Sequence, residues 1–231
     1  MKNNIIKLFC GCIFMQSLLA IGGVGFYGNM DVFSSTPVAT SEDNVTITPQ
    51  SIDSPFAAGV MLYIDVLPFV DLEADFEISL KSYDFDNKVG DISKTGTFQY
   101  SRFSQYYTVR REIIGLSIPV LAKIQLYGGA GFNMHTVTPS ISVDFIKGAF
   151  GSMSVADAVG QDFTDTGILT DLAEYMTDNK ISSNGYHLQF GFQGKVLMLN
   201  LFANARYTIA KDVVPGENGF ASIWTGLAFS F

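Results

Sequence analysis

Residues 72–80 alternate strictly between apolar and polar side chains, and this alternation constrains the fold more than any other feature of the chain. The segment reads LEADFEISL, so Glu73, Asp75 and Glu77 each stand between apolar neighbours. Successive side chains of a β-strand point to opposite faces of the sheet. The alternation therefore predicts a strand with one apolar face and one charged face.

The same period of two recurs along the chain and predicts eight strands. They cover residues 23–33, 58–66, 71–81, 106–118, 121–135, 186–195, 199–208 and 221–231. The fourth of these strands is irregular, because Arg110 and Glu112 fall on its apolar side. A β-bulge near Ile113 and Ile114 would restore the register.

The connections between the predicted strands are alternately short and long. The long ones are residues 34–54, 86–104, 136–185 and 211–218. Short turns at one end and long loops at the other are typical of outer-membrane barrels. We therefore predict an all-β fold, an eight-stranded antiparallel transmembrane β-barrel with short periplasmic turns and long extracellular loops.

The alternation alone does not decide which face of the strands points outward. A soluble barrel would turn the apolar faces into its core, whereas a membrane barrel turns them toward lipid. Glu73, Asp75 and Glu77 cannot face lipid, since each charge there costs several kcal/mol. The leader, the absence of cysteine after it and the terminal Phe231 favour lipid outside and charges inside.

The start of the chain predicts export. Two lysines precede an uninterrupted apolar stretch that ends in small residues, which is the layout of a secretory signal peptide. We place the signal peptide at residues 1–22 and the barrel domain at residues 23–231, with cleavage after Ala20 as the alternative. An uncleaved anchor or lipidation of Cys10 or Cys12 remain further alternatives. Both cysteines of the chain lie here, so the mature protein has no disulfide and no thiol chemistry.

The chain ends in LAFSF, with Leu227, Phe229 and Phe231 on one strand face. This ending, the leader, the eight strands and the alternation of short and long connections resemble the small outer-membrane barrels of Gram-negative bacteria, the family of outer membrane proteins A, X and W. The resemblance implies that the three residues are the signal read by the barrel assembly machinery. It also implies a place in the cell outer membrane, with outer-membrane lipid and periplasmic chaperones as further partners.

The charges on the polar faces form the first candidate site. An eight-stranded barrel is just wide enough inside for side chains to fill it. We expect a buried ion-pair network there, because buried charges must be paired. A gated polar conduit is the alternative. The predicted members are Glu73, Asp75, Glu77, Lys81, Lys123, Lys195 and Arg206.

The two histidines of the chain form the second candidate site. His135 and His187 both fall on the polar strand faces that are predicted to point into the barrel, and they flank the connection 136–185. We therefore expect them at the mouth of the barrel. Two imidazoles there could bind a metal or transfer protons. The simpler interpretation is a pair of polar rim residues.

The connection 136–185 is the longest of the chain, and loops of this length usually carry function. Its segments DFIKGAFGSM and ILTDLAEYM show apolar residues at helical spacing. Short helices there would form a lid, rest on the membrane or present a surface to an extracellular ligand.

Taken together, the sequence predicts a structural or loop-mediated binding role. The alternative is a narrow porin-like channel or transporter for small solutes. A third possibility is a lipid-acting enzyme that uses a histidine beside Ser182 or Ser183. Nothing visible organises these serines, so we expect no enzyme, no catalytic residue, no metal and no cofactor. The formal net charge of −8 argues against nucleic acid as a partner.

Overall fold

The computed structural model describes residues 22–65, 69–118, 121–151 and 166–231. The predicted signal peptide lies outside the described residues except for Gly22, which begins strand β1. Among the described residues, no helix has the length and apolar character needed to cross a membrane.

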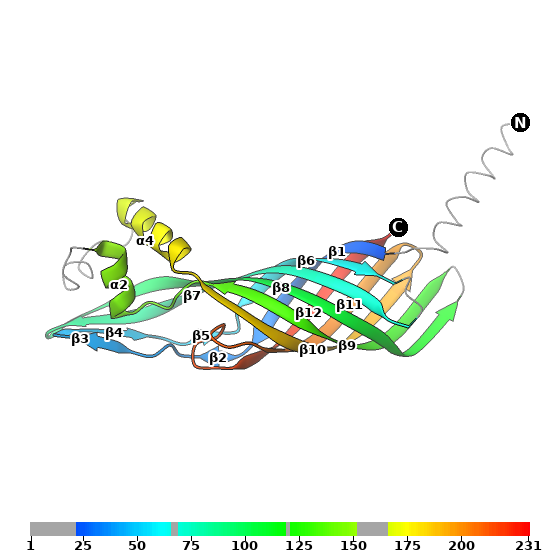
Figure 1. Ribbon diagram of the computed structural model, residues 1–231, viewed down its shortest axis with the longest axis horizontal. Helices are drawn as coiled ribbons and strands as arrows, with labels where there is room; N and C mark the ends of the chain where they lie inside the picture. The colour runs from blue at the N-terminus through cyan, green and yellow to red at the C-terminus, as the bar shows by residue number, and fades with distance from the viewer. Residues whose placement is uncertain (1–21, 66–68, 119–120, 152–165) are drawn as a thin grey trace, which may run out of the picture.

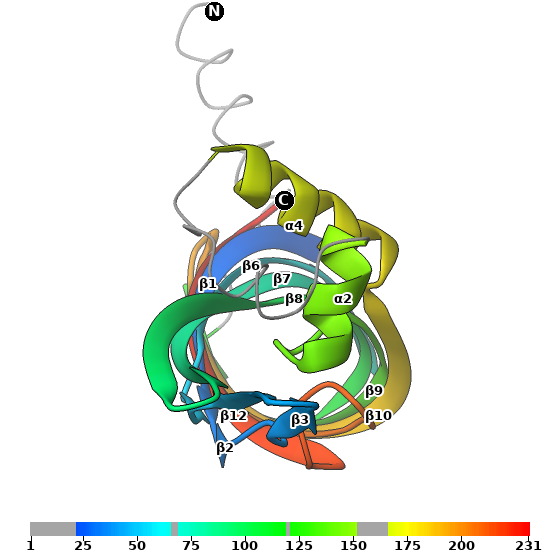
Figure 2. The same cartoon turned by 90° about the vertical axis from the view of Figure 1, so that its left-hand side faces the viewer.

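Eight strands close into a ring, which Figure 2 shows end on. β7 pairs with both β6 and β8, and β1 pairs with β6 and β12, so the ring has no open edge. Every neighbouring pair is antiparallel, which confirms the predicted eight-stranded antiparallel barrel. The strands are β1 (Gly22–Val32), β6 (Phe56–Ile64), β7 (Asp71–Val89), β8 (Ile92–Ile118), β9 (Ala122–Val137), β10 (Ile181–Val196), β11 (Leu199–Ile209) and β12 (Gly219–Ser230).

The barrel turns its apolar faces outward. Ile78 and Leu80 of β7 are about half exposed, whereas the side chains of Glu73, Asp75 and Glu77 are buried inside. The predicted bulge is present as a register shift between Glu112 and Ile114. Before this shift, Arg110 points inward and is fully buried. After it, β8 continues with apolar residues outside.

Strands β7 and β8 continue beyond the barrel and form a long hairpin (Figure 1). The prediction of a loop at residues 86–104 is therefore wrong, because these residues pair from Val89 opposite Ile92 onward. The predicted loop 34–54 also contains strands, and the connection between β9 and β10 is shorter than predicted, since Val137 pairs with Ile181. The added strands are β2 (Ser34–Ser35), β3 (Thr40–Glu42), β4 (Val45–Pro49) and β5 (Ile52–Asp53).

Polarity inverts where the hairpin leaves the barrel. Up to Leu80, β7 carries apolar residues outside and acids inside, but further on Tyr83 and Phe85 are buried inside while Asp84 and Asp86 lie outside. The inversion means that the outer face meets an apolar surrounding below this point and water above it. We call the part above it the extension: β3, β4, residues 81–101 of β7 and β8, and two helices.

The helices are α2 (Val143–Phe150) and α4 (Thr166–Asp178), in the segments with helical spacing. Ser142 caps α2, because its Oγ accepts a hydrogen bond of 3.0 Å from the N–H of Phe145. The N–H of Val143 donates to Thr40 Oγ1 at 2.9 Å, and this bond ties the helix to β3. Both helices lie at the extension end, opposite the end that carries the C-terminus (Figure 1).

An apolar cluster fills the junction between extension and barrel, and we call it the mouth cluster. α2 contributes Phe145 and Ile146 to it, α4 contributes Leu172, and the connection between β11 and β12 contributes Val213 and Val214. Its other members are Val45, Ile47, Ile52, Tyr83, Phe85, Tyr100, Val137, Ile141, Val143, Ala210 and Phe220.

Candidate functional site

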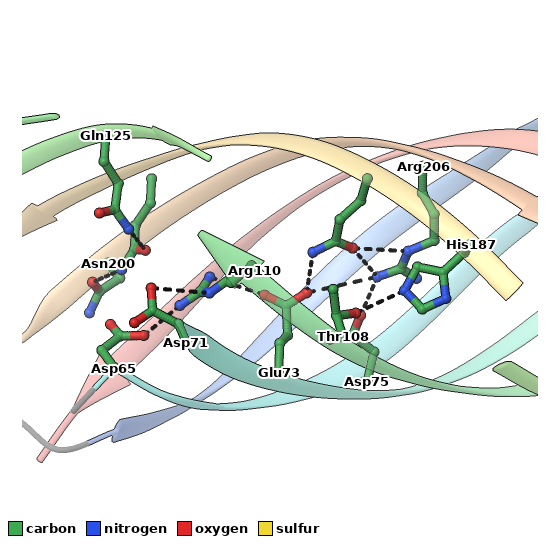
Figure 3. A network of polar contacts seen from close by, with 12 residues as sticks. Asp65, Asp71, Glu73, Asp75, Thr108, Arg110, Gln125, His187, Asn200 and Arg206 are labelled. Atoms are coloured by element: carbon green, nitrogen blue, oxygen red, sulfur yellow. Dashed lines mark hydrogen bonds and ion pairs between the residues drawn. The ribbon is translucent and has the colours of Figure 1, made fainter. Parts of the chain in front are cut away.

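Arg206 and Arg110 organise the centre of the barrel interior (Figure 3). Arg206 forms an ion pair with Asp75, and its Nε donates to Gln189 Oε1 at 3.2 Å. Gln189 in turn donates to Glu73 Oε1 at 2.8 Å, while Glu73 Oε2 lies 3.0 Å from Arg110 Nη1. The two arginines thus share one chain of contacts, and each buried charge in it has an opposite partner.

Arg110 extends this network toward the end of the barrel where the C-terminus lies. Its Nη2 lies 2.6 Å from Asp65 Oδ1, and its Nε lies 3.8 Å from Asp71 Oδ2. Both aspartates are partly exposed, so the network reaches from the dry interior to the rim.

Arg102 forms a second group of charges nearer the extension. Its Nη2 lies 2.9 Å from both Asp31 Oδ2 and Glu77 Oε1, and all three side chains are completely buried. Asn29 donates to Glu77 Oε2 at 2.9 Å. Arg102 was not among the predicted network residues, since it stands in a segment predicted to be a loop. Its position two residues before Ser104 and four before Tyr106, on the same strand face, was the signal that could have found it.

The predicted network is brought together only in part. Glu73, Asp75, Glu77 and Arg206 are buried and in contact through the groups above. Lys123 lies apart, in a half-exposed pair with Glu112 at 2.9 Å. Lys81 and Lys195 are partly exposed and form no ion pair within the described part of the chain. The long, strongly hydrated lysines stay near water, and arginines carry the buried positive charges instead.

The two histidines lie inside the barrel, on either side of Tyr106. The ring centre of Tyr106 is 5.5 Å from that of His135 and 5.3 Å from that of His187. Both imidazoles have hydrogen-bond partners: His135 Nδ1 lies 2.9 Å from Ser104 Oγ, and His187 Nε2 lies 2.9 Å from Thr108 Oγ1. Within the described ranges, no three His, Cys, Asp or Glu side chains group together as a metal site would require.

Aromatic rings occupy the interior around Arg110. Below Arg110, a second apolar group packs around its guanidinium, whose carbon lies 4.9 Å from the ring centre of Tyr127 and 5.3 Å from that of Tyr63. Members of this group are Tyr27, Met61, Tyr63, Tyr127, Phe202, Trp224 and Ala228. Fully buried aromatics and ion pairs together occupy the bore of the barrel, as expected for eight strands.

The mouth cluster sits directly on the upper charges. The Phe220 ring centre lies 4.5 Å from the guanidinium carbon of Arg102 and 6.1 Å from the ring centre of His135. Tyr100, beside it, donates its hydroxyl to the carbonyl of Val213 at 3.0 Å. An apolar layer therefore separates the charged interior from the extension.

The three residues of the predicted assembly signal all have exposed side chains, two of them on β12 and Phe231 directly after it. Leu227, Phe229 and Phe231 are between half and two thirds exposed. The backbone N–H of Phe231 donates to the carbonyl of Gly22 at 3.0 Å, so the end of the chain lies beside the start of β1.

No protein-family model matches the chain, and no curated protein sequence does. Solved structures of outer-membrane proteins resemble the chain at low sequence identity, with TM-scores below 0.5. The outer membrane protein OprG from Pseudomonas aeruginosa is 14% identical, with 91% of this chain and 95% of that chain covered and a TM-score of 0.49. Neisserial surface protein A is 11% identical (91% and 97% covered, TM-score 0.43), and the attachment invasion locus protein Ail of Yersinia pestis is 9% identical (91% and 97%, TM-score 0.41).

Proposed function

We propose that this protein is an integral outer-membrane β-barrel whose closed body anchors a binding surface outside the cell. The inversion of polarity along β7 carries the proposal. Ile78 and Leu80 are exposed and apolar, whereas Asp84 and Asp86 on the same outer face are polar. A soluble barrel would need polar residues outside along its whole height, so the apolar belt calls for lipid.

The height of the belt fits a membrane. β1 and β11 each have 11 residues, and tilted strands of about 9–11 residues span a bilayer. The extension then stands in water beyond one membrane surface. Its long hairpin and helices correspond to the long extracellular connections of such barrels, while the opposite end holds the short turns.

The filled interior supports a role as an anchor and not as a pore. Arg206, Arg110 and Arg102 cross the bore with their acidic partners, and the mouth cluster covers them. A solute would have to break buried ion pairs and displace an apolar layer. Recognition then falls to the extension, which is the part of the protein that faces the surroundings of the cell.

Planar-bilayer recording tests the closed body. We expect the refolded protein to insert into lipid bilayers and to show no discrete conductance steps. Insertion is checked independently, by protease cleavage confined to the extension in sealed vesicles. A mature chain that stays monomeric and soluble without detergent would contradict the membrane assignment itself.

A narrow channel is the second candidate, and one observation favours it. The hydroxyls of Tyr27 and Tyr106 and the Nδ1 atom of His187 are buried without a partner among the described residues. Buried polar groups in folded proteins usually bind water when no protein group is available. This candidate would be supported over the anchor by regular conductance steps in the unmodified protein. The steps should disappear when the residues around Arg206 are cross-linked and Arg206 itself is kept.

In the proposed function, the exposed Leu227, Phe229 and Phe231 are read by the barrel assembly machinery. Periplasmic chaperones would carry the unfolded chain to it, since the apolar faces of the strands need protection before lipid covers them.

A further inference from the structure

One edge of β8 above the barrel has no neighbouring strand in the described part of the chain. β8 pairs with β7 from Ile92 onward, but its pairing with β9 begins only at Arg102, opposite Val137. Figure 1 shows the hairpin of β7 and β8 reaching far beyond the barrel. Residues 92–101 of β8 therefore run along an edge of the extension, in the position that β9 leaves vacant when it ends.

The backbone of this edge points its hydrogen-bonding groups outward. The N–H of Ser101 donates to Thr138 Oγ1 at 2.9 Å, and the carbonyl of Ser101 accepts from the N–H of Thr138 at 3.0 Å. Both groups of Ser101 thus face away from β7. Because alternate residues of a strand face the same way, the N–H and carbonyl groups of Thr97 and Thr95 point to the same side. No described strand lies there to pair with them.

A cavity of about 660 Å³ lies at the lower end of this edge. β8 lines it with Thr97, Gln99 and Ser101, and α4 lines it with Leu172 and Met176. The cavity therefore combines a strand edge, which offers backbone hydrogen bonds, with an apolar wall, which can take a side chain. That combination is how proteins bind extended peptides by strand addition.

The outer face beside this edge carries two acids on β7, while Lys88 lies nearer the hairpin tip and Lys180 lines the cavity. Asp84 Oδ1 accepts a hydrogen bond of 2.8 Å from Thr97, and Asp86 Oδ1 accepts one of 2.7 Å from Thr95, so both carboxylates are held on the side of β8. Neither carboxylate forms an ion pair with a described lysine or arginine. A strand added beside β8 would place its long side chains next to this face, and basic side chains would suit it.

We propose that the edge of β8 at residues 93–99 binds an extended polypeptide with basic side chains, which adds as a further strand and ends in the cavity beside α4. The proposal rests on the proposed function, since only a membrane-anchored barrel presents this edge to other molecules. A second copy of the chain is a poorer occupant, because it would bring the same acids to the same edge, and the formal net charge is −8.

The binding experiment uses the refolded protein in nanodiscs of zwitterionic lipid and a labelled peptide with four Lys-Val repeats and blocked ends. The control peptide has the same composition in two blocks, four lysines followed by four valines. Both peptides carry the same charge, but only the first presents alternating side chains as a strand. We expect fluorescence anisotropy to show binding of the alternating peptide that is about tenfold tighter than that of the block peptide.

Two variants at one position separate strand addition from charge attraction. Thr97→Pro removes an N–H that points away from β7, so the ladder between β7 and β8 stays intact. Thr97→Val removes the hydroxyl but keeps the N–H. We expect Thr97→Pro to weaken binding of the alternating peptide about tenfold and Thr97→Val to change it about twofold at most. Hydrogen exchange at the Thr95 amide should slow when the peptide binds the unmodified protein.

The proposal would be overturned if the unmodified protein bound both peptides equally well, or if both variants bound the alternating peptide with equal affinity. Either result would leave only nonspecific charge attraction. A doubling of the protein mass in nanodisc-free detergent that Thr97→Pro abolishes would also overturn it, in favour of a second copy at the edge. These failures are separate from failure of the proposed function. Membrane insertion and the absence of conductance are measured on the same preparations and do not depend on Thr97.

Discussion

The guanidinium carbon of Arg206 lies 3.9 Å from the centre of the Tyr106 ring, and the same guanidinium forms an ion pair with Asp75. All three groups are fully buried in the middle of the barrel. The arginine thus has an aromatic face on one side and a carboxylate on another. This arrangement satisfies a charge that would otherwise be very unfavourable at the depth of the lipid belt.

Replacing Arg206 should therefore destabilise the barrel strongly. Arg206→Met leaves Asp75 buried without its partner, and we expect the free energy of unfolding to fall by about 3–5 kcal/mol. Urea unfolding in lipid vesicles measures it. The matched control is Lys123→Met, which breaks the half-exposed pair with Glu112 and should cost about 1 kcal/mol or less. Equal losses of unfolding free energy in the two variants would show that the buried pair of Arg206 and Asp75 stabilises the barrel no more than the half-exposed pair does.

The second prediction concerns Tyr83 in the extension. Burial raises the pKa of its hydroxyl from 10.0 to about 12, although the N–H of Ile141, which donates to the hydroxyl oxygen at 3.1 Å, lowers it in part. The unfolded chain therefore ionises first as the pH rises. The stability from the buried neutral phenol is complete below pH 10 and is lost between pH 10 and 12, by about 2–3 kcal/mol in total.

Unfolding of the extension at a series of pH values measures this loss. Tyr83→Phe has no group to ionise at this place, so its stability should fall less steeply than that of the unmodified protein over the same range. Parallel curves for the two proteins would contradict the assigned environment of Tyr83.

The third prediction distinguishes a structural role of the histidines from metal binding. His135 Nδ1 and Nε2 are both occupied, by Ser104 at 2.9 Å and by Asn133 at 3.0 Å. A metal ion would have to replace these contacts. We expect zinc or nickel to leave the melting temperature unchanged, and His135→Ala to lower stability by about 1–3 kcal/mol through the loss of hydrogen bonds. A metal-dependent rise in melting temperature that His135→Ala abolishes would contradict the structural role.

The part of the fold inside the lipid belt could be predicted from the sequence, because lipid imposes one polarity on every outward residue. Leu72, Ile78 and Leu80 had to alternate with Glu73, Asp75 and Glu77, and they do so in the structure. The bulge near Ile114 was detectable for the same reason: two charged residues broke an otherwise regular pattern.

The extension could not be predicted in this way, since both of its faces border on protein or water. In residues 97–102, Thr97, Gln99 and Ser101 on the outer face alternate with Phe98, Tyr100 and Arg102, and no side of that pattern is uniformly apolar. The segment therefore resembled a polar loop, and Arg102 with its two buried acid partners was lost from the predicted network. Lys123 and Lys195 were included in the predicted network because the alternation shows which face of the strand a side chain lies on. It does not show how deep inside the barrel that side chain lies.

The fourth prediction concerns the end of the chain. Phe231 is about two thirds exposed on the outer face and contributes little to packing inside the protein. We expect Phe231→Ser to refold from urea into detergent with nearly normal stability, but to reach the outer membrane of cells in strongly reduced amount. Leu201→Ser, at another outward position of about half exposure, is the control and should affect assembly less. Equal yields from the two variants would argue against a special role of Phe231 in assembly.

The fifth prediction tests which part of the protein binds. Val137 pairs with Ile181, so a short turn can replace residues 140–180 without disturbing the barrel. This replacement removes α2 and α4, together with Phe145, Ile146 and Leu172 of the mouth cluster. We expect normal membrane insertion, loss of extracellular binding and still no discrete conductance steps, because the ion pairs of Arg102 and Arg206 involve no residue of this segment and remain across the bore.

A gentler variant tests whether the mouth cluster itself closes the body. Phe145→Ala keeps both helices but removes a ring whose centre lies 5.2 Å from those of Phe98 and Tyr175. It should cost about 3–5 kcal/mol of local stability, as measured by hydrogen exchange in α2, while the body stays closed because the ion pairs of Arg102 and Arg206 remain. If Phe145→Ala alone opened a conducting path, the mouth cluster and not the ion-pair network would be the barrier, and the closed body would depend on the lid that covers it.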